Sequence, residues 1–386
     1  MRTTWSHIQL VSLLVVAIVA VVVVQRWSIE SKECDEAAQM HEAAELCARW
    51  FDIVGSTKQS LGIKPDNHSA TRFAGMIGDE YTYQTTTLGS LEAKETAANP
   101  DFAALMLRLF LEAGMDSHST IGILQSGSFP TLSIATLAAA QTLGAKVVLV
   151  SSLGASMYGA NQADATWMDM ESWLRENGDL RYRSSVVTLG AESDNGQGMI
   201  EDGVAVLKAA AERNGVTLFE PASLEEAIDA KTDLMSRSAI NLLVNIGGNQ
   251  AAVGRCVHSS TIPNGLHNTW QGCSDRDRGV LTRLSEAGVP FVHLLNIKDL
   301  ASQYGMPISP GNTIAPATDL YVQNRVHPLG PALGLVLLLS LLTAKKVSDR
   351  SSYRADTAHQ LPSPAPEKNK SSKIAEVLSD RYYPPD

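Results

Sequence analysis

Short apolar runs alternate with longer amphipathic or alanine-rich stretches along the middle of the chain. The apolar runs predict strands, and they lie near residues 120–125, 146–151, 184–189, 216–219, 240–246 and 290–295. The stretches between them predict helices, near residues 131–143, 166–176, 199–213, 223–237 and 277–287. Strands that alternate with helices of this length are typical of an α/β domain. We therefore expect a Rossmann-like, largely parallel sheet flanked by helices.

The clearest of these units covers residues 120–156. A β-branched, apolar strand ends in a Ser-Gly-Ser turn, a helix rich in Ala and Leu follows until Gly144, and a second apolar strand comes next. The turn therefore opens a helix, whose first backbone N–H groups have no partner within the helix. Such groups are suited to binding an anionic or polar ligand above the sheet edge.

Four of the predicted strands lead directly into loops that contain glycine. In a parallel sheet these loops share the carboxyl edge, where open α/β folds bind their ligands. We therefore expect a binding site at this edge, although turn formation alone would also explain the asparagines. The candidate ligand-binding residues are Gly127, Ser152, Gly154, Ser156, Asn161, Gly190, Gly247, Gly248 and Asn249.

Candidate catalytic residues lie in the same region. Ser126 and Ser128 stand at the end of a strand and the start of a helix, where a nucleophile or an anion-binding hydroxyl fits, and where helix capping alone would also favour serine. Asp169, one turn into a helix, is a candidate acid or base, or a residue that complements the helix dipole. The nucleophile-elbow motif G-x-S-x-G is incomplete, because Tyr158 replaces its last glycine.

No cofactor or metal is expected. Neither the G-x-G-x-x-G nor the G-x-x-x-x-G-K-[ST] nucleotide motif occurs, and no C-x-x-C pair or helical pair of histidines is present. His293 falls inside an apolar strand, as a core histidine would.

Both ends of the chain carry an apolar run, at residues 8–24 and 329–344. We expect one transmembrane helix at each end. A cleaved signal peptide is the alternative for the first run, and a buried core helix is the alternative for the second. Four cations follow the second run, Lys345, Lys346, Arg350 and Arg354, and they predict a cytoplasmic C-terminus. Both termini would then be cytoplasmic and the central region extracytoplasmic.

This pattern predicts five parts. They are an N-terminal anchor at 1–26, a helical stalk and linker at 27–74, the extracytoplasmic α/β domain at 75–325, a second transmembrane helix at 326–344, and a disordered cytoplasmic tail at 345–386.

The net charge and the cysteines indicate which ligands and which cellular compartment suit the protein. Residues 27–325 contain 21 Lys and Arg against 35 Asp and Glu, a net charge of −14, which argues against nucleic-acid binding. All four cysteines lie in this region, where an exported domain can form disulfides. Cys256 with Cys273 is the more favourable pair. Cys34 with Cys47 is less favourable, because a straight helix would hold them about 20 Å apart, and free buried thiols are the alternative.

Seven short blocks together resemble the bacterial poly-gamma-glutamate system protein family, and the resemblance covers roughly residues 75–325. The blocks are residues 78–82 (Gly-Asp-Glu-Tyr-Thr), 85–94 (Thr-Thr-Thr-Leu-Gly-Ser-Leu-Glu-Ala-Lys), 99–104 (Asn-Pro-Asp-Phe-Ala-Ala), 126–130 (Ser-Gly-Ser-Phe-Pro), 151–156 (Ser-Ser-Leu-Gly-Ala-Ser), 158–161 (Tyr-Gly-Ala-Asn) and 166–171 (Thr-Trp-Met-Asp-Met-Glu).

The resemblance implies an accessory protein of poly-gamma-glutamate biosynthesis or export in the bacterial inner membrane, with the other subunits of that machinery and a glutamate-derived ligand or polymer as partners. It implies no reaction and no catalytic residues. Two alternatives stay open: an extracytoplasmic amide hydrolase or transferase that uses Ser126 or Ser128, and a non-catalytic scaffold of the synthase complex. The acidic domain would repel the polyanion unless cations such as Lys94, Arg108, Arg255 or Arg325 form a local patch.

Overall fold

A computed structural model describes residues 11, 14–22, 29–65, 68–255, 262–270, 278–312, 318–326, 332–336, 339–340, 343 and 346 of the chain. The chain divides into two compact units. The larger comprises Lys32–Gln323, and the smaller combines Met1–Ser31 with Asn324–Asp386.

A six-stranded sheet forms the centre of the larger unit, in the order β6-β4-β3-β7-β9-β8. Its strands are β6 (Ser184–Thr188), β4 (Lys146–Ser152), β3 (Thr120–Ser126), β7 (Leu242–Ile246), β9 (Phe291–Leu294) and β8 (Gly265–His267). Every pair is parallel except β8 with β9. The predicted α/β class with a largely parallel sheet is confirmed. The strand predicted at 216–219 is not part of it, because only Leu218 makes a bridge, to Val187.

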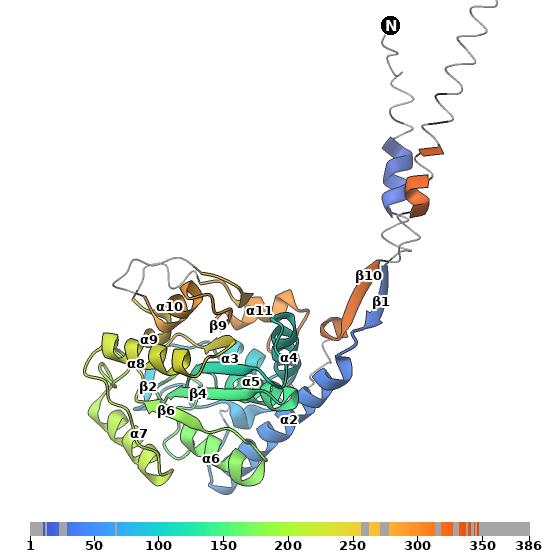
Figure 1. The fold of residues 1–386 in the computed structure, drawn as a ribbon. Coiled ribbons are helices and arrows are strands. Elements are labelled where there is room, and N and C mark those ends of the chain that lie inside the picture. Colours follow the sequence, from blue (N-terminus) through green and yellow to red (C-terminus); the bar gives the residue numbers. More distant parts are fainter. Residues whose placement is uncertain are drawn as a thin grey trace, which may run out of the picture. The chain divides into compact units, whose positions relative to one another are not determined.

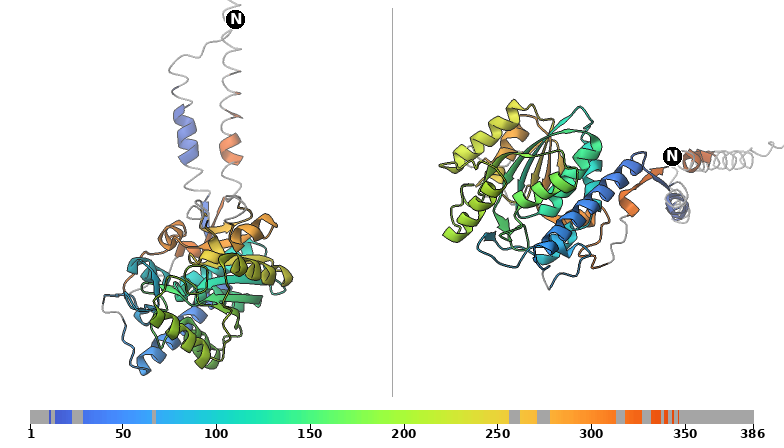
Figure 2. Two further views of the ribbon diagram at one scale, coloured as in Figure 1. Left: turned by 90° about the vertical axis from the view of Figure 1, so that its left-hand side faces the viewer. Right: turned by 90° about the horizontal axis from the view of Figure 1, so that it is seen from below.

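Helices cover both faces of this sheet (Figures 1 and 2). Side chains alternate along β3, so Ile121 and Ile123 join the core under one helical layer and Leu124 joins the core under the other. The first layer contains α2 (Ala37–Ser60), α4 (Asp101–Glu112), α5 (Pro130–Leu143), α6 (Trp167–Asn177), α7 (Glu201–Arg213) and α11 (Ile297–Gln303). The second contains α8 (Leu224–Arg237), α9 (Gln250–Val253) and α10 (Val280–Glu286).

The remaining elements are short. A helix, α3 (Leu91–Ala97), follows the strand β2 (Thr85–Thr87), which pairs with β5 (Ala155–Ser156) in a separate two-stranded sheet. A further two-stranded sheet joins β1 (Ile29–Glu33) and β10 (Val322–Val326), and two single 3₁₀ turns are at Ala74–Met76 and Thr318–Leu320.

The helix α5 shows how local sequence sets the architecture. Pro130 occupies the first turn, where its missing N–H costs nothing, and Gly144 ends the helix in the left-handed region with φ of 79°. Twelve of its fourteen residues are buried, which explains why the segment is apolar on all sides. It lies between the sheet and the helices α2 and α4, as Figure 2 shows from below.

The helix α2 belongs to this core and is not a separate stalk. Its side chains Met40, Cys47, Trp50 and Phe51 are fully buried, and the helix packs on α4 and α5. It also continues to Ser60, through part of the region predicted as a linker. Residues 55–60 are glycine and polar side chains, and the one that is buried, Lys58, donates a hydrogen bond to the Ile77 carbonyl at 3.2 Å.

Cys34 and Cys47, the less favourable of the two candidate pairs, do not form a disulfide: both are free, buried thiols, which was the alternative. Burial raises the pKa of the Cys47 thiol well above its ordinary value. The pair predicted between Cys256 and Cys273 lies outside the described residues.

The smaller unit carries helical turns at residues 14–22 and 332–336. Their aliphatic side chains are more than half exposed: Leu14, Val15, Ile18, Val19, Val21, Val22, Leu333, Leu335 and Val336. Within the described part of the chain, no helix has both the length and the apolar character to cross a membrane. Much of both predicted spans, and the whole tail after residue 346, lies outside the described residues.

Trp50→Ala is expected to destabilise the larger unit by about 3–5 kcal/mol, because it removes a fully buried indole from the core between α2 and its neighbours. Urea unfolding followed by circular dichroism measures the change. Leu61→Ala, at a side chain that is 55% exposed just after the same helix, is the control and should change the free energy of unfolding by less than about 0.5 kcal/mol. An equal effect of both variants would contradict the core role of α2.

Candidate functional site

A cavity of about 920 Å³ opens at the carboxyl edge of the sheet. It lies where β3 and β7 are neighbours and where their following helices, α5 and α9, pass to opposite faces. This is the switch point at which open α/β sheets bind ligands. Its walls come from six segments: residues 86–94, 126–129, 154–156, 191–199, 248–250 and 295–298.

The pairing of β2 with β5 brings a distant part of the chain to this edge. Thr85 is in register with Ala155 and Thr87 with Ser156. The helix α3 begins directly after β2, capped by the Ser90 hydroxyl, which accepts a hydrogen bond from the Ala93 N–H. One turn later the helix presents Lys94 to the cavity.

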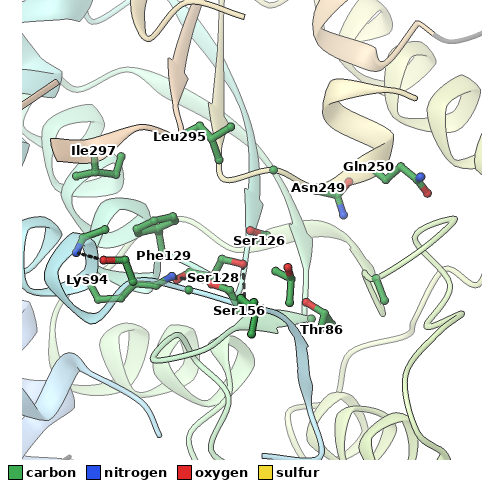
Figure 3. Close-up of a pocket in the computed structure, with 18 of the residues that line it drawn as sticks. Thr86, Lys94, Ser126, Ser128, Phe129, Ser156, Asn249, Gln250, Leu295 and Ile297 are labelled. Atoms are coloured by element: carbon green, nitrogen blue, oxygen red, sulfur yellow. Dashed lines mark hydrogen bonds between the residues drawn. The ribbon is translucent and has the colours of Figure 1, made fainter. Parts of the chain in front are cut away.

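Lys94 and Ser156 form a hydrogen-bonded pair at the wall of the cavity. The Lys94 Nζ atom donates to Ser156 Oγ at 2.8 Å and also contacts the Ser128 carbonyl oxygen. It lies 3.6 Å from the centre of the Phe129 ring. Figure 3 shows Lys94, Ser128 and Ser156 on one side of the cavity, with Asn249 and Gln250 on the other. Both members of the pair are buried, yet both line the cavity.

The burial of Lys94 favours its neutral form. Burial lowers the pKa of this lysine to about 7. Its contacts in the described part of the chain are a hydroxyl, a carbonyl and a ring, and none of these is a carboxylate. A large fraction of Lys94 is therefore an uncharged amine at neutral pH, and such an amine can accept a proton from a hydroxyl.

Ser126 and Ser128, the predicted nucleophiles, line the cavity, but neither contacts a proton acceptor suited to activate it among the described residues. Ser126 Oγ donates weakly to the Ile246 carbonyl at 3.4 Å. Ser128 Oγ accepts a hydrogen bond from the Ser156 N–H at 3.0 Å and so holds the Ser156 backbone in place. The arrangement makes Ser156 the better candidate nucleophile, and makes Ser128 a residue that positions it.

Gly247 explains how the β7 loop comes so close to β3. Its φ is 88°, and a Cβ atom there would lie 2.5 Å from Ser126 Oγ. Any side chain would therefore close the narrow space between the two strand ends. The two residues that follow, Gly248 and Asn249, are predicted ligand residues and line the cavity.

The loop after β6 forms a further wall and has an unusual backbone. Ala191, Ser193 and Asp194 have φ between 53° and 63°, and Gly190, Gly196 and Gly198 are also left-handed. Non-glycine residues in this region are strained, and they persist only where the surrounding structure fixes them.

A buried ion pair fixes this loop. Asp194 is fully buried and pairs with Lys231 of α8. Its Oδ1 atom also accepts hydrogen bonds from Ser152 Oγ and from Asn249 Nδ2, both at 2.8 Å. The network therefore joins the ends of β4, β6 and β7 behind the cavity wall. Ser152, a predicted ligand residue, belongs to this network and does not line the cavity.

Other predicted residues also have supporting positions. Asn161 is buried and exchanges two hydrogen bonds with the Asp79 backbone. Gly127, Gly190 and Gly247 shape the loops but do not line the cavity, whereas Gly154 and Ser156 line it.

Asp169 is not brought to the serines. Its carboxylate caps α6 by accepting from the Thr166 N–H at 2.8 Å, and it pairs with Arg213. Hydrogen bonds from Arg213, Asn214 and Thr166 outweigh burial and lower the pKa of this carboxyl. It therefore stays ionised as a structural anion.

Sequence reasoning did not assign a catalytic role to Lys94, nor any role to Gln250 and Lys298, all of which line the cavity. No local motif marks Lys94, because its partner lies 62 residues away and meets it only through the β2–β5 pairing. Among the described residues, no group of three or more His, Cys, Asp or Glu side chains is placed to hold a metal ion.

Lys231→Met is expected to destabilise the larger unit by about 3–5 kcal/mol, because it leaves the buried Asp194 carboxylate without its counter-ion. Urea unfolding measures this loss. The double variant Lys231→Met, Asp194→Asn removes both charges and should recover part of the stability, since Asn tolerates the left-handed backbone at this position. A double variant less stable than Lys231→Met alone would contradict this interpretation.

Comparison of the chain with protein-family models, with curated proteins and with solved structures found no match.

Proposed function

We propose that the larger unit is an acyl hydrolase or transferase that acts on amide bonds, with Ser156 as nucleophile and Lys94 as general base. The 2.8 Å contact between Lys94 Nζ and Ser156 Oγ at the wall of a large cavity carries this proposal. A serine hydroxyl is a weak nucleophile until a neighbouring base takes its proton, and a buried lysine with a pKa of about 7 is such a base.

The reaction proceeds in two balanced steps. Neutral Lys94 takes the Ser156 proton while Oγ attacks the carbonyl carbon, and the ammonium of Lys94 returns that proton to the amine as the C–N bond breaks. An acyl group is then esterified to Ser156. Water, or an amine in the transferase reaction, attacks this ester, Lys94 takes its proton, and the proton returns to Ser156 Oγ as the product leaves.

The start of α5 supports the charge that develops on the carbonyl oxygen. Ser128 and Phe129 line the same cavity as Ser156, directly before the first helical residue, Pro130. Backbone N–H groups at a helix N-terminus carry partial positive charge and are suited to an oxyanion. The first turn of α5 contains no acidic side chain that would compete for these groups.

The process that this activity serves is proposed from the sequence resemblance and from the ends of the chain. The resemblance to the poly-gamma-glutamate system proteins suggests an amide-linked glutamate product and the other subunits of that machinery as partners. The exposed aliphatic side chains at residues 14–22 and 332–336 favour two membrane anchors, with the larger unit outside the bacterial inner membrane. In this proposal the unit trims or transfers the product as it leaves the membrane.

One observation favours a second function, binding without chemistry. The Ser128 carbonyl and the Phe129 ring stabilise the ammonium form of Lys94, so the same cavity can hold a ligand through a fixed cation. A binding module or scaffold retains ligand affinity without turnover.

Ser156→Ala is expected to abolish release of p-nitroaniline from N-acetyl-γ-glutamyl-p-nitroanilide by the detergent-solubilised full chain, with a loss of at least about 1000-fold in kcat/KM. The acyl intermediate on Ser156 should appear in the intact mass of the wild type after mixing with the corresponding p-nitrophenyl ester. Ser126→Ala, at the other serine of the same wall, is the matched variant. If it abolishes turnover while Ser156→Ala does not, Ser126 is the nucleophile; absence of turnover by the wild type would favour binding alone.

The pH dependence reports the base. Lys94 acts as an uncharged amine and its pKa is lowered to about 7, so kcat/KM should rise about tenfold per pH unit below pH 7 and level off above it. Lys94→Met should abolish turnover at every pH. The control is Lys58→Met, at a second buried lysine whose pKa burial lowers to about 8 and which donates to the Ile77 carbonyl at 3.2 Å. Lys58 does not line the cavity, so in this variant kcat/KM should still rise with pH up to about pH 7. If the rise instead moves to another pH, Lys58 is the group that titrates.

A further inference from the structure

The cavity differs in charge from the unit that contains it. Two of its lining side chains are cationic, Lys94 and Lys298, and only one is acidic, Glu192. Residues 27–325 as a whole carry a net charge of −14. A lysine side chain at the cavity wall can pair with a negatively charged ligand, whereas the acidic surface of the unit as a whole repels one.

The two lysines are not equivalent. Lys94 is buried and has its pKa lowered to about 7, so it is suited to proton transfer. The Lys298 side chain is 41% exposed and lies at the cavity wall, next to Ile297, whose side chain is buried. Lys298 is therefore a cation on an anchored helix start that a substrate can reach.

Lys298 already forms an ion pair with a carboxylate. Lys298 Nζ pairs with Glu92 Oε2 at 2.6 Å, and the Glu92 side chain is 52% exposed. Glu92 does not line the cavity, but it lies on α3, the helix that carries Lys94. The contact links α3 to α11 across 206 residues of sequence, so it ties the element with the general base to the adjoining part of the cavity wall.

We propose that Lys298 is a specificity-determining residue that binds a carboxylate of the substrate in exchange for Glu92. This inference rests on the proposed function and names its substrate class: amides whose acyl group carries a free carboxylate. The exchange replaces one ammonium–carboxylate pair with another, so an anionic substrate loses no charge pairing on entry. A neutral substrate makes no such exchange, so only an anionic substrate depends on Lys298 for its charge pairing in the cavity.

The experiment compares two substrates that differ only in charge, using the detergent-solubilised full chain. They are N-acetyl-γ-glutamyl-p-nitroanilide, with a free α-carboxylate, and its α-carboxamide. Lys298→Gln should raise KM for the carboxylate about five- to tenfold, with little change in kcat and none in KM for the carboxamide. Glu92→Gln removes the competing carboxylate and should lower KM for the carboxylate substrate several-fold.

The matched control is Lys208→Gln. Lys208 pairs with Glu220 at 2.7 Å, and the two side chains are 46% and 50% exposed, so this ion pair resembles Lys298–Glu92 in geometry and exposure. It does not line the cavity. Lys208→Gln should leave both KM values unchanged, which separates a local role of Lys298 from a general effect of surface charge.

The outcomes distinguish the two proposals. If Ser156→Ala abolishes turnover but Lys298→Gln changes KM equally for both substrates, or for neither, the specificity inference is wrong and the acyl-transfer function stands. If Ser156→Ala turns over either substrate normally, the proposed function fails. In that case direct binding of N-acetylglutamate to wild type and to Lys298→Gln, measured by calorimetry, still tests the carboxylate site, and equal affinities would overturn it.

Discussion

Removal of the Lys94 amine from water is the constraint on which the site depends. A lysine in water holds its proton far above neutral pH and cannot act as a base there. Burial, which removes the amine from water, is what lowers its pKa. The fold has to supply that environment from three segments, α3, β5 and the start of α5, which is why the β2–β5 pairing matters as much as the central sheet.

The central sheet supplies the frame for this environment. Parallel strands place their carboxyl ends at one edge, and the strand order changes direction between β3 and β7, so the helices that follow them pass to opposite faces. Gly247 allows those loops to approach closely, and the Asp194–Lys231 pair holds the neighbouring wall. The strand topology therefore determines where the cavity lies, and the side chains then determine its shape.

This division explains what the sequence could predict. The strands β3, β4, β6, β7 and β9 and the glycine loops after them follow from local periodicity, so the α/β class and the edge that carries the cavity were predictable. The prediction of a separate stalk in place of α2 was wrong. The apolar face of that helix packs on α4 and α5, and this contact cannot be predicted from the local sequence. Likewise Ser156 was a candidate from its loop, but its partner Lys94 depends on a contact between distant segments. Ser126 and Ser128 were favoured because they lie at a helix start. Position in the sequence does not show which base lies near a serine in the folded chain.

The left-handed loop at residues 190–198 has a consequence for the way a ligand enters. A loop that is free in solution must lose backbone entropy when it closes on a ligand, at about 1–2 kcal/mol per residue that becomes ordered. Here the loop is already tied by Asp194 to Lys231, Ser152 and Asn249. The loss of backbone entropy therefore occurs when the chain folds and not when the ligand binds. Ligand affinity at this edge then depends on the shape and charge of the wall, with no further ordering of the loop.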